Sequence, residues 1–260
     1  MKLCLIQQPS GLGDILLSIK IASLYSDEGY EIIWPVFPVY SNLNEKIEAP
    51  FINFVNMQDK YRYKDVYEKL CRRNLREVYK EKEGDNYFIF VPIKNSFHSS
   101  WGKALQRFDS HDASNMLAKF LMCDTTYENW QNYFKLKRDL QKEESLIKHL
   151  QIKKDFHLVQ KIFGTPPTWM EKLNRDIKTP DNLQRVEVDY IDGYDVFDWI
   201  GVFEMASKID VVSTSSFYFF EKLNLKCKPT IYSRNTPHRS DLENFEWLRK
   251  LAKKEYNYIS

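Results

Sequence analysis

Residues 2–14, KLCLIQQPSGLGD, predict the beginning of an α/β fold. The apolar run 2–7 has the length of a β-strand, and residues 9–14 form a turn with two glycines. Through residues 15–25 apolar side chains recur at nearly the spacing of one helix face, at positions 15, 16, 19, 22 and 24. A strand, a glycine turn and a helix in this order are typical of parallel sheets that helices cover.

The same alternation recurs along the chain. Further strands are expected at 31–37, 51–56, 87–92, 156–160, 185–188, 210–213 and 229–232. Further helices are expected at 42–48, 64–82, 113–122, 137–150, 167–173, 196–209, 217–223 and 242–255. Because the alternation stops after residue 92 and restarts at 156, we predict two Rossmann-like lobes facing each other across a cleft. Their expected domains are 1–151 and 152–260.

Composition excludes several classes of protein. The 260 residues include 43% hydrophobic ones, 8 Gly and 10 Pro, which excludes disordered and collagen-like chains. A net charge of +2 argues against a general nucleic-acid binder. The four cysteines form no CxxC pair, and no apolar run approaches the ~18 residues of a membrane span. We expect a soluble cytoplasmic protein with free thiols, no transmembrane segment, no metal and no cofactor.

The glycine turn is the first candidate for chemistry. Gly11 and Gly13 let the backbone approach a ligand, and free N–H groups at a helix start attract anions. Asp14 falls in the first helical turn. Two interpretations stay open for its carboxylate: a cap that complements the helix dipole, or a general base at the floor of a cleft.

Loops after strands of the second half supply further candidates. Lys161 and Thr165 follow the strand at 156–160 and are placed to contact a phosphate or a sugar. The run Thr214, Ser215 and Ser216 precedes a helix, where it either binds phosphate oxygens or only caps the helix. Arg234 follows the last strand of this half, as an anion ligand or as a solvated surface residue.

Three further residues have a structural and a functional interpretation. Trp169 follows the Lys161 loop, and we expect it in the core. His98 and Arg107 lie in the polar stretch after the strand at 87–92. For each of these two residues, two interpretations stay open: it lines an acceptor pocket, or it lies on the surface.

Taken in order, these pieces resemble GT-B glycosyltransferases of the heptosyltransferase kind, glycosyltransferase family 9. In that family the first strand leads into a Gly-x-Gly-Asp turn, matched here by residues 11–14, and its aspartate is the proposed base. The family's Asp-Thr-Gly corresponds to residues 214–216, and its Tyr-Gly-Pro-Thr-x-Pro corresponds to 232–237. The chain departs from the pattern at Thr214, Ser216, Ser233 and Arg234.

The resemblance implies transfer of a sugar from a nucleotide-diphosphate donor to a hydroxyl of a glycan acceptor. The transfer would invert the anomeric centre and need no metal. The N-terminal lobe would bind the acceptor and the C-terminal lobe the nucleotide sugar, with the last helix packing back on the first lobe. Asp14 would deprotonate the acceptor. Lys161, Arg234 and the amides of Ser215 and Ser216 would stabilise the departing diphosphate.

Three alternatives stay open. A nucleotide-sugar epimerase or hydrolase would use the same architecture. A non-catalytic nucleotide- or glycan-binding module is suggested by Thr214, which stands where the family has an aspartate. An RNA-binding protein would use the 16 Tyr and 17 Phe for stacking, but the near-neutral charge argues against it.

Overall fold

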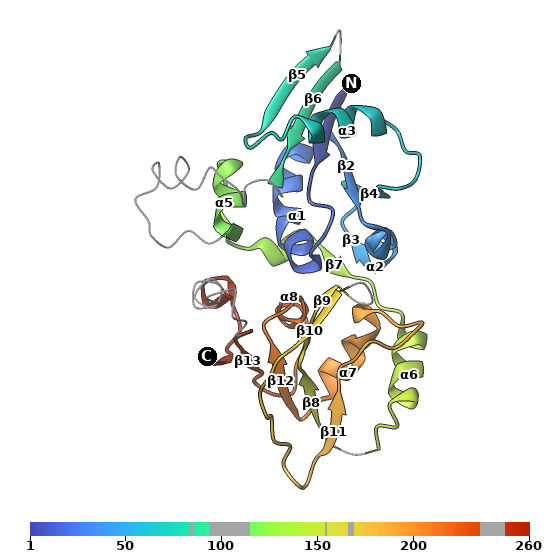
Figure 1. Ribbon diagram of the computed structural model, residues 1–260, viewed down its shortest axis with the longest axis vertical. Helices are drawn as coiled ribbons and strands as arrows, with labels where there is room; N and C mark the ends of the chain where they lie inside the picture. The colour runs from blue at the N-terminus through green and yellow to red at the C-terminus, as the bar shows by residue number, and fades with distance from the viewer. Residues whose placement is uncertain (84–85, 94–114, 154, 166–168, 235–247) are drawn as a thin grey trace. The chain divides into compact units, whose positions relative to one another are not determined.

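The computed structural model describes residues 1–83, 86–93, 115–153, 155–165, 169–234 and 248–260. The structure is mixed α/β with parallel sheets, which confirms the α/β part of the prediction. The chain forms two compact units, Met1–Leu136 and Lys137–Ser260 (Figure 1).

The boundary between these units lies earlier than the predicted division at residue 151. Helix α6 (Leu140–His149) packs against α7 (Ile200–Met205) of the second unit. The Arg138 guanidinium joins them, because it donates to Glu143 of α6 at 2.9 Å and to Glu204 of α7 at 2.6 Å. These contacts place α6 in the second unit.

The first unit is built on one five-stranded sheet in the order β4-β2-β1-β6-β5. Its strands are β1 (Lys2–Ile6), β2 (Glu31–Val36), β4 (Ile52–Asn56), β5 (Tyr79–Glu83) and β6 (Asn86–Val91). All neighbours are parallel except β5 and β6. Connections between parallel strands are right-handed as a rule. Along this strand order, the connection from β1 to β2 runs toward β4, whereas the connection from β4 to β6 runs toward β5. Their helices, α1 (Leu12–Asp27) and α3 (Lys64–Arg72), therefore cover opposite faces.

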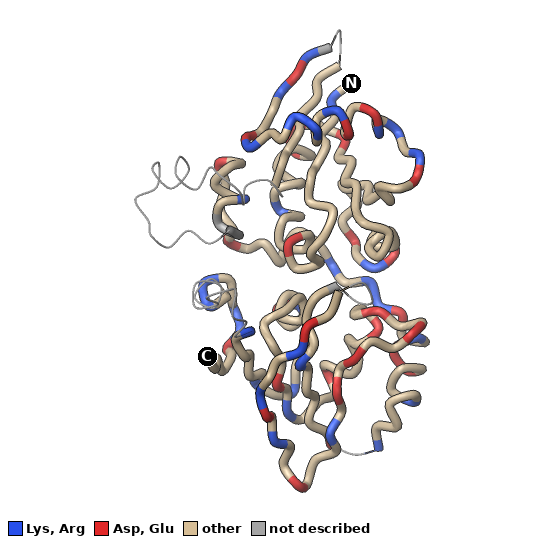
Figure 2. Tube along the Cα trace, in the orientation of Figure 1, with Lys and Arg blue, Asp and Glu red and all other residues tan. Residues whose placement is uncertain are grey.

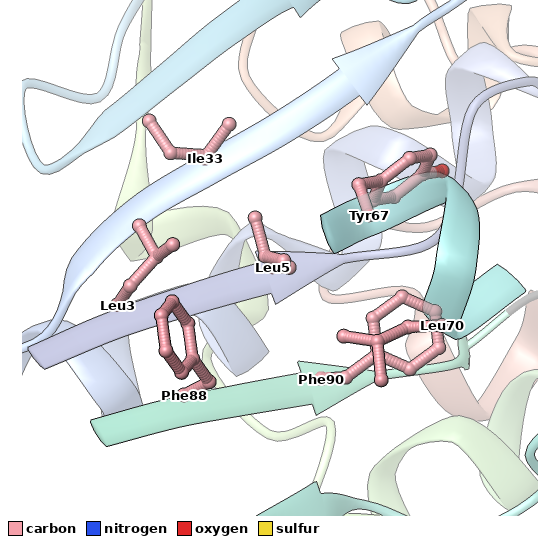
Figure 3. Close-up of a cluster of buried hydrophobic side chains, with 7 residues drawn as sticks. All are labelled: Leu3, Leu5, Ile33, Tyr67, Leu70, Phe88 and Phe90. Atoms are coloured by element: carbon pink, nitrogen blue, oxygen red, sulfur yellow. The ribbon is translucent and has the colours of Figure 1, made fainter. Parts of the chain in front are cut away.

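One part of the core of this unit lies between α3 and the sheet (Figure 3). Side chains alternate between the two faces of a strand, so Leu3 and Leu5 point to the same face. There they pack with Tyr67 and Leu70 of α3 and with Ile33, Phe88 and Phe90 of the neighbouring strands. Smaller elements complete the unit: η1 (Pro38–Tyr40), α2 (Leu43–Lys46), β3 (Ile47–Glu48), α5 (Asn115–Met122), η3 (Trp130–Tyr133) and β7 (Lys135–Leu136).

The second unit has a fully parallel sheet in the order β11-β8-β12-β13-β14. Its strands are β8 (Phe156–Gln160), β11 (Gln184–Glu187), β12 (Lys208–Val212), β13 (Thr230–Tyr232) and β14 (Asn257–Ile259). The antiparallel hairpin of β9 (Ile162–Thr165) and β10 (Trp169–Lys172) follows β8. The 3-10 helix η4 (Val196–Trp199) precedes α7, and α8 (Ser216–Phe220) follows β12.

The two faces of this second sheet are covered differently. Val159 and Val212 pack with Phe163 of the hairpin and with Leu173 and Ile177 of the segment after it. The connections from β11 to β12 and from β12 to β13 run in the same direction, so α7 and α8 lie together on the other face.

Several predicted helices are shorter than expected or are strands. The helix expected at 64–82 ends at Arg72, and residues 79–83 form β5, because their alternating side chains pair with β6. The helix expected at 167–173 is wrong: residues 169–172 are β10, which pairs with β9. The helix at 196–209 ends at Met205 because Ile209 is a buried residue of β12. Of the helix expected at 242–255, residues 242–247 lie outside the described residues, 248–251 are helical, and 252–255 are not helical.

Charged residues of both signs are interspersed along both units (Figure 2). This mixture accords with the net charge of +2. Among the described helices, none combines the length and the apolar character that a membrane crossing requires.

Candidate functional site

The topology of the first unit makes the carboxyl ends of β1 and β6 the candidate ligand site. The chain leaving β1 continues toward β2 on one side, while β6 lies on the other side of β1. Open α/β sheets bind ligands where the strand order diverges in this way. The loop from Gln7 to Gly11, which joins β1 to α1, lies at this switch point.

Gly11 allows the carboxylate of Asp14 to fold back over the loop. Gly11 has a φ of 80°, which other residues rarely adopt. A Cβ atom at this position would lie 2.5 Å from Oδ2 of Asp14, so a side chain cannot fit without displacing the carboxylate. The first glycine of the motif is therefore needed for the placement of its aspartate. Gly13 is the second residue of α1.

An ion pair with Lys119 of α5 fixes the carboxylate of Asp14. The Lys119 Nζ lies 2.5 Å from Oδ1 of Asp14. The Lys119 side chain is 0% exposed, whereas Asp14 is 29% exposed. Burial lowers the pKa of the Lys119 ammonium, and Asp14 opposes this by favouring the charged form. The result is a carboxylate held from inside the unit by a cation and open to solvent on another side.

Gln8 completes this arrangement and stiffens the loop. Its Oε1 accepts a hydrogen bond from Lys119 Nζ at 2.8 Å, and its Nε2 donates to the Ser10 carbonyl at 2.5 Å. The Gln8 carbonyl in turn accepts from the Trp34 indole at 2.9 Å. The Oε1 atom of neighbouring Gln7 is buried and has no hydrogen-bond partner among the described residues. We refer to Gln8, Asp14 and Lys119 as the carboxylate site.

Sequence reasoning identified Asp14 but missed Lys119 and Gln8. The two interpretations of Asp14, helix cap and general base, did not include an ion pair. A signal was present, because Lys119 is the only charged residue of the largely apolar helix sequence NMLAKFLM at 115–122. A cation on an apolar helix face that becomes buried needs an anionic partner.

The second unit has its own switch point, between β8 and β12. The chain leaving β8 passes to β11, whereas the chain leaving β12 passes to β13. Arg234, just after β13, donates from Nε to the Ser213 carbonyl at 2.6 Å. Its guanidinium also lies 5.1 Å from the centre of the Phe163 ring. The structure therefore brings together the loops that follow β8, β12 and β13.

Residues 214–216 form the turn from β12 into α8. Ser216 is fully buried, and its hydroxyl donates to Oε1 of Gln160 at 2.6 Å, so this side chain joins α8 to β8. Ser215 precedes α8 without a capping hydrogen bond from its side chain. The Thr214 carbonyl accepts from the amide of Phe217 at 3.2 Å and begins the turn into α8.

The remaining predicted residues are distributed as follows. Lys161 is half-buried between β8 and β9. Thr165 ends β9, but its side chain lies outside the described part of the structure, as do His98 and Arg107 entirely. Trp169 is 47% exposed, so the expectation that it belongs to the core is wrong.

A second polar cluster lies under the sheet of the second unit, away from the carboxyl ends. His157 Nε2 lies 2.6 Å from Oδ2 of Asp210, and His157 Nδ1 lies 3.0 Å from the Thr179 hydroxyl. Lys208 Nζ is 2.9 Å from the same Asp210 oxygen. Burial alone would raise the pKa of Asp210, but the hydrogen bonds from His157 and Lys208 lower it. This cluster holds the segment after the hairpin onto the sheet.

Comparisons with known proteins add no assignment. No protein-family model, curated protein or solved structure matches this chain. Within the described residues, no group of three or more His, Cys, Asp or Glu side chains could hold a metal ion. The four cysteines are free.

Proposed function

We propose that this protein transfers a sugar from a nucleotide-diphosphate donor to a hydroxyl acceptor, with Asp14 as the general base. The observation that carries the proposal is the carboxylate site, where a partly exposed Asp14 is fixed by the buried Lys119 at a sheet's switch point. In a GT-B glycosyltransferase one α/β half binds the acceptor and the other binds the donor. We assign these roles to the first and second units.

In the proposed reaction the acceptor hydroxyl donates a hydrogen bond to the Asp14 carboxylate. Its proton passes to Asp14 while its oxygen attacks the anomeric carbon of the donor. The bond from that carbon to the diphosphate breaks on the opposite face, its electron pair leaves with the diphosphate, and the anomeric centre inverts. Lys119 keeps the orientation of the carboxylate during the transfer. No metal enters this scheme.

On the donor side, the proposal uses charge at the carboxyl edge of the second sheet. Arg234 is fixed there by its bond to the Ser213 carbonyl, and Lys161 lies in the loop that follows β8. A guanidinium and an ammonium would stabilise the negative charge that develops on the departing diphosphate. The backbone amides of Ser215 and Ser216, at the start of α8, are the remaining predicted donor ligands.

The Asp14→Asn variant tests this function directly. The amide keeps an oxygen for Lys119 but cannot accept a proton at neutral pH, so turnover should fall by about 10²- to 10⁴-fold. Donor affinity should stay within a few fold, because the proposal places the donor on the second unit. Asp65→Asn is the matched control, since Asp65 is an exposed carboxylate in the first turn of α3.

Donors are found first by thermal shift with UDP, GDP, ADP, CMP, dTDP and their sugars. A ligand at 100 times its Kd adds about 2.7 kcal/mol of stability. Sugar transfer is then measured with each donor that binds. A wild-type protein that binds a nucleotide but transfers no sugar would be a binding module. Release of free sugar or epimer without an acceptor would indicate the hydrolase or epimerase instead.

A further inference from the structure

The hairpin β9–β10 exposes an aromatic side chain beside the proposed donor site. It begins two residues after β8 ends, at the carboxyl edge of the sheet (Figure 1). Trp169, the first residue of β10, is opposite Thr165, and Met170 is opposite Gly164. Trp169 is 47% exposed and Met170 is 44% exposed. Because they are consecutive strand residues, these two side chains point to opposite faces of the hairpin.

One side of the Trp169 indole is held in place by the hairpin. Gly164 has a φ of 124°, and a Cβ atom there would lie 2.8 Å from Cε3 and 3.1 Å from Cζ3 of Trp169. The six-membered ring of the indole therefore lies against Gly164, and a side chain at position 164 would displace the ring. The ring of buried Phe163 meets the indole edge to face, with the ring centres 6.5 Å apart. Half of a large apolar side chain thus remains in water although its orientation is fixed.

Phe163 links this indole to the cationic end of the sheet. It contacts Trp169 on the hairpin and the guanidinium of Arg234. Arg234 is fixed in turn by the Ser213 carbonyl at the end of β12. A flat aromatic surface and a guanidinium therefore both contact one buried ring. A nucleotide needs these two features, because it has an aromatic base and negative phosphates.

We propose that Trp169 is the stacking surface for the nucleobase of the nucleotide donor. This inference rests on the proposed function, and it assigns the hairpin to recognition of the base while Arg234 serves the diphosphate. Every nucleobase has a flat π-face, so stacking on Trp169 supplies affinity with little selection among bases. The geometry favours a base over an acceptor sugar, because Arg234 lies at the same edge.

The experiment measures binding to the full-length chain by isothermal titration calorimetry. The probes are UDP, ADP and GDP, together with inorganic pyrophosphate, which lacks a base. Trp169→Ala should weaken binding of the nucleoside diphosphates about tenfold or more, the effect typical of losing one stacked base. Pyrophosphate binding should not change. Trp169→Phe should restore nucleotide affinity to within about threefold of wild type, since it keeps an aromatic face.

Met170→Ala is the matched control, because Met170 is the similarly exposed neighbour on the other face of the hairpin. It should bind every probe as the wild type does. Unchanged nucleotide affinity in Trp169→Ala would overturn the inference, as would an equal loss for pyrophosphate. A change confined to the KM of the acceptor would also overturn it, since Trp169 would then bind acceptor sugar.

The outcomes separate this inference from the proposed function. If the wild type transfers sugar and Trp169→Ala binds nucleotide normally, only the stacking role fails. If Trp169 is needed for nucleotide binding but no sugar is transferred, the transferase fails and the stacking role holds. If the wild type binds no nucleoside diphosphate, both are overturned.

Discussion

Replacing Asp14 by alanine should destabilise the first unit far more than replacing its partner Lys119 by methionine. The difference follows from burial: the Lys119 side chain is 0% exposed, whereas Asp14 is 29% exposed. Without Asp14, the ammonium remains inside the unit with Gln8 as its hydrogen-bonding neighbour. Without Lys119, the carboxylate can still be hydrated from its exposed side, and methionine fills a similar volume.

The loss of stability in each variant can be estimated from the known effect of removing one partner of a buried ion pair. Removing one partner of such a pair typically costs about 3–5 kcal/mol, and the Gln8 amide oxygen places Asp14→Ala near the lower end, at about 3 kcal/mol. Lys119→Met should cost about 1 kcal/mol or less, because an apolar side chain in place of a buried charge is often neutral. The double variant should resemble Lys119→Met, which leaves a coupling free energy of about 3 kcal/mol.

Urea denaturation of the wild type, the two single variants and the double variant provides the measurement. With a urea dependence of roughly 1–3 kcal/mol per molar, Asp14→Ala should lower the midpoint by about 1–3 M. The defect should also shrink as the pH rises toward about 10. Burial lowers the pKa of Lys119 in the folded state and Asp14 opposes this, so loss of Asp14 lowers that pKa further. The folded variant then binds fewer protons at Lys119 than the folded wild type, and its stability rises more steeply with pH. Equal costs for the two single variants that simply add in the double variant would refute the reasoning.

Two further variants test the loop geometry and the buried pair of the second unit. Gly11→Ala forces a φ of 80° on alanine and places its Cβ 2.5 Å from Oδ2 of Asp14, so it should lower the free energy of unfolding by about 1–3 kcal/mol and reduce turnover. Gly29→Ala, which has no atom within 4 Å of its Cβ, is the control for the backbone cost alone. Equal losses of stability in the two variants would contradict the clash with Asp14. Asp210→Asn should destabilise the protein at pH 7, and the difference in stability from the wild type should narrow as the pH falls below about 4. The reason is that the hydrogen bond from His157 lowers the pKa of Asp210, and the carboxylate stabilises the fold only while it is ionised. A pH-independent difference in urea midpoints would argue against an ionised Asp210.

The glycine turn and its flanking elements could be predicted from the local sequence. A strand-length apolar run, two glycines and a helical apolar spacing predicted β1, the loop and α1 in their observed order. The positive φ at Gly11 explains why local sequence sufficed, since few other residues adopt that backbone conformation. Asp14 was identified for the same reason, because its position in the first helical turn is set by its neighbours in sequence.

The hairpin was misread because strand pairing is not local. Residues 169–172 are strand because Trp169 and Met170 pair with Thr165 and Gly164, and this pairing overrides any helical tendency of the segment itself. The exposure of Trp169 depends on the same pairing. Composition favours burial of a tryptophan, whereas here the hairpin holds its ring at the surface.

Local sequence specified β1, the glycine turn and the position of Asp14, because backbone preference and side-chain periodicity act over a few residues. The partners of Asp14 were decided only by the tertiary structure: Lys119 is 105 residues away in the chain, and it reaches the carboxylate only when α5 packs against α1. The physical reason is desolvation. The lysine ammonium is well solvated in water, and it needs a carboxylate partner only once folding has buried it.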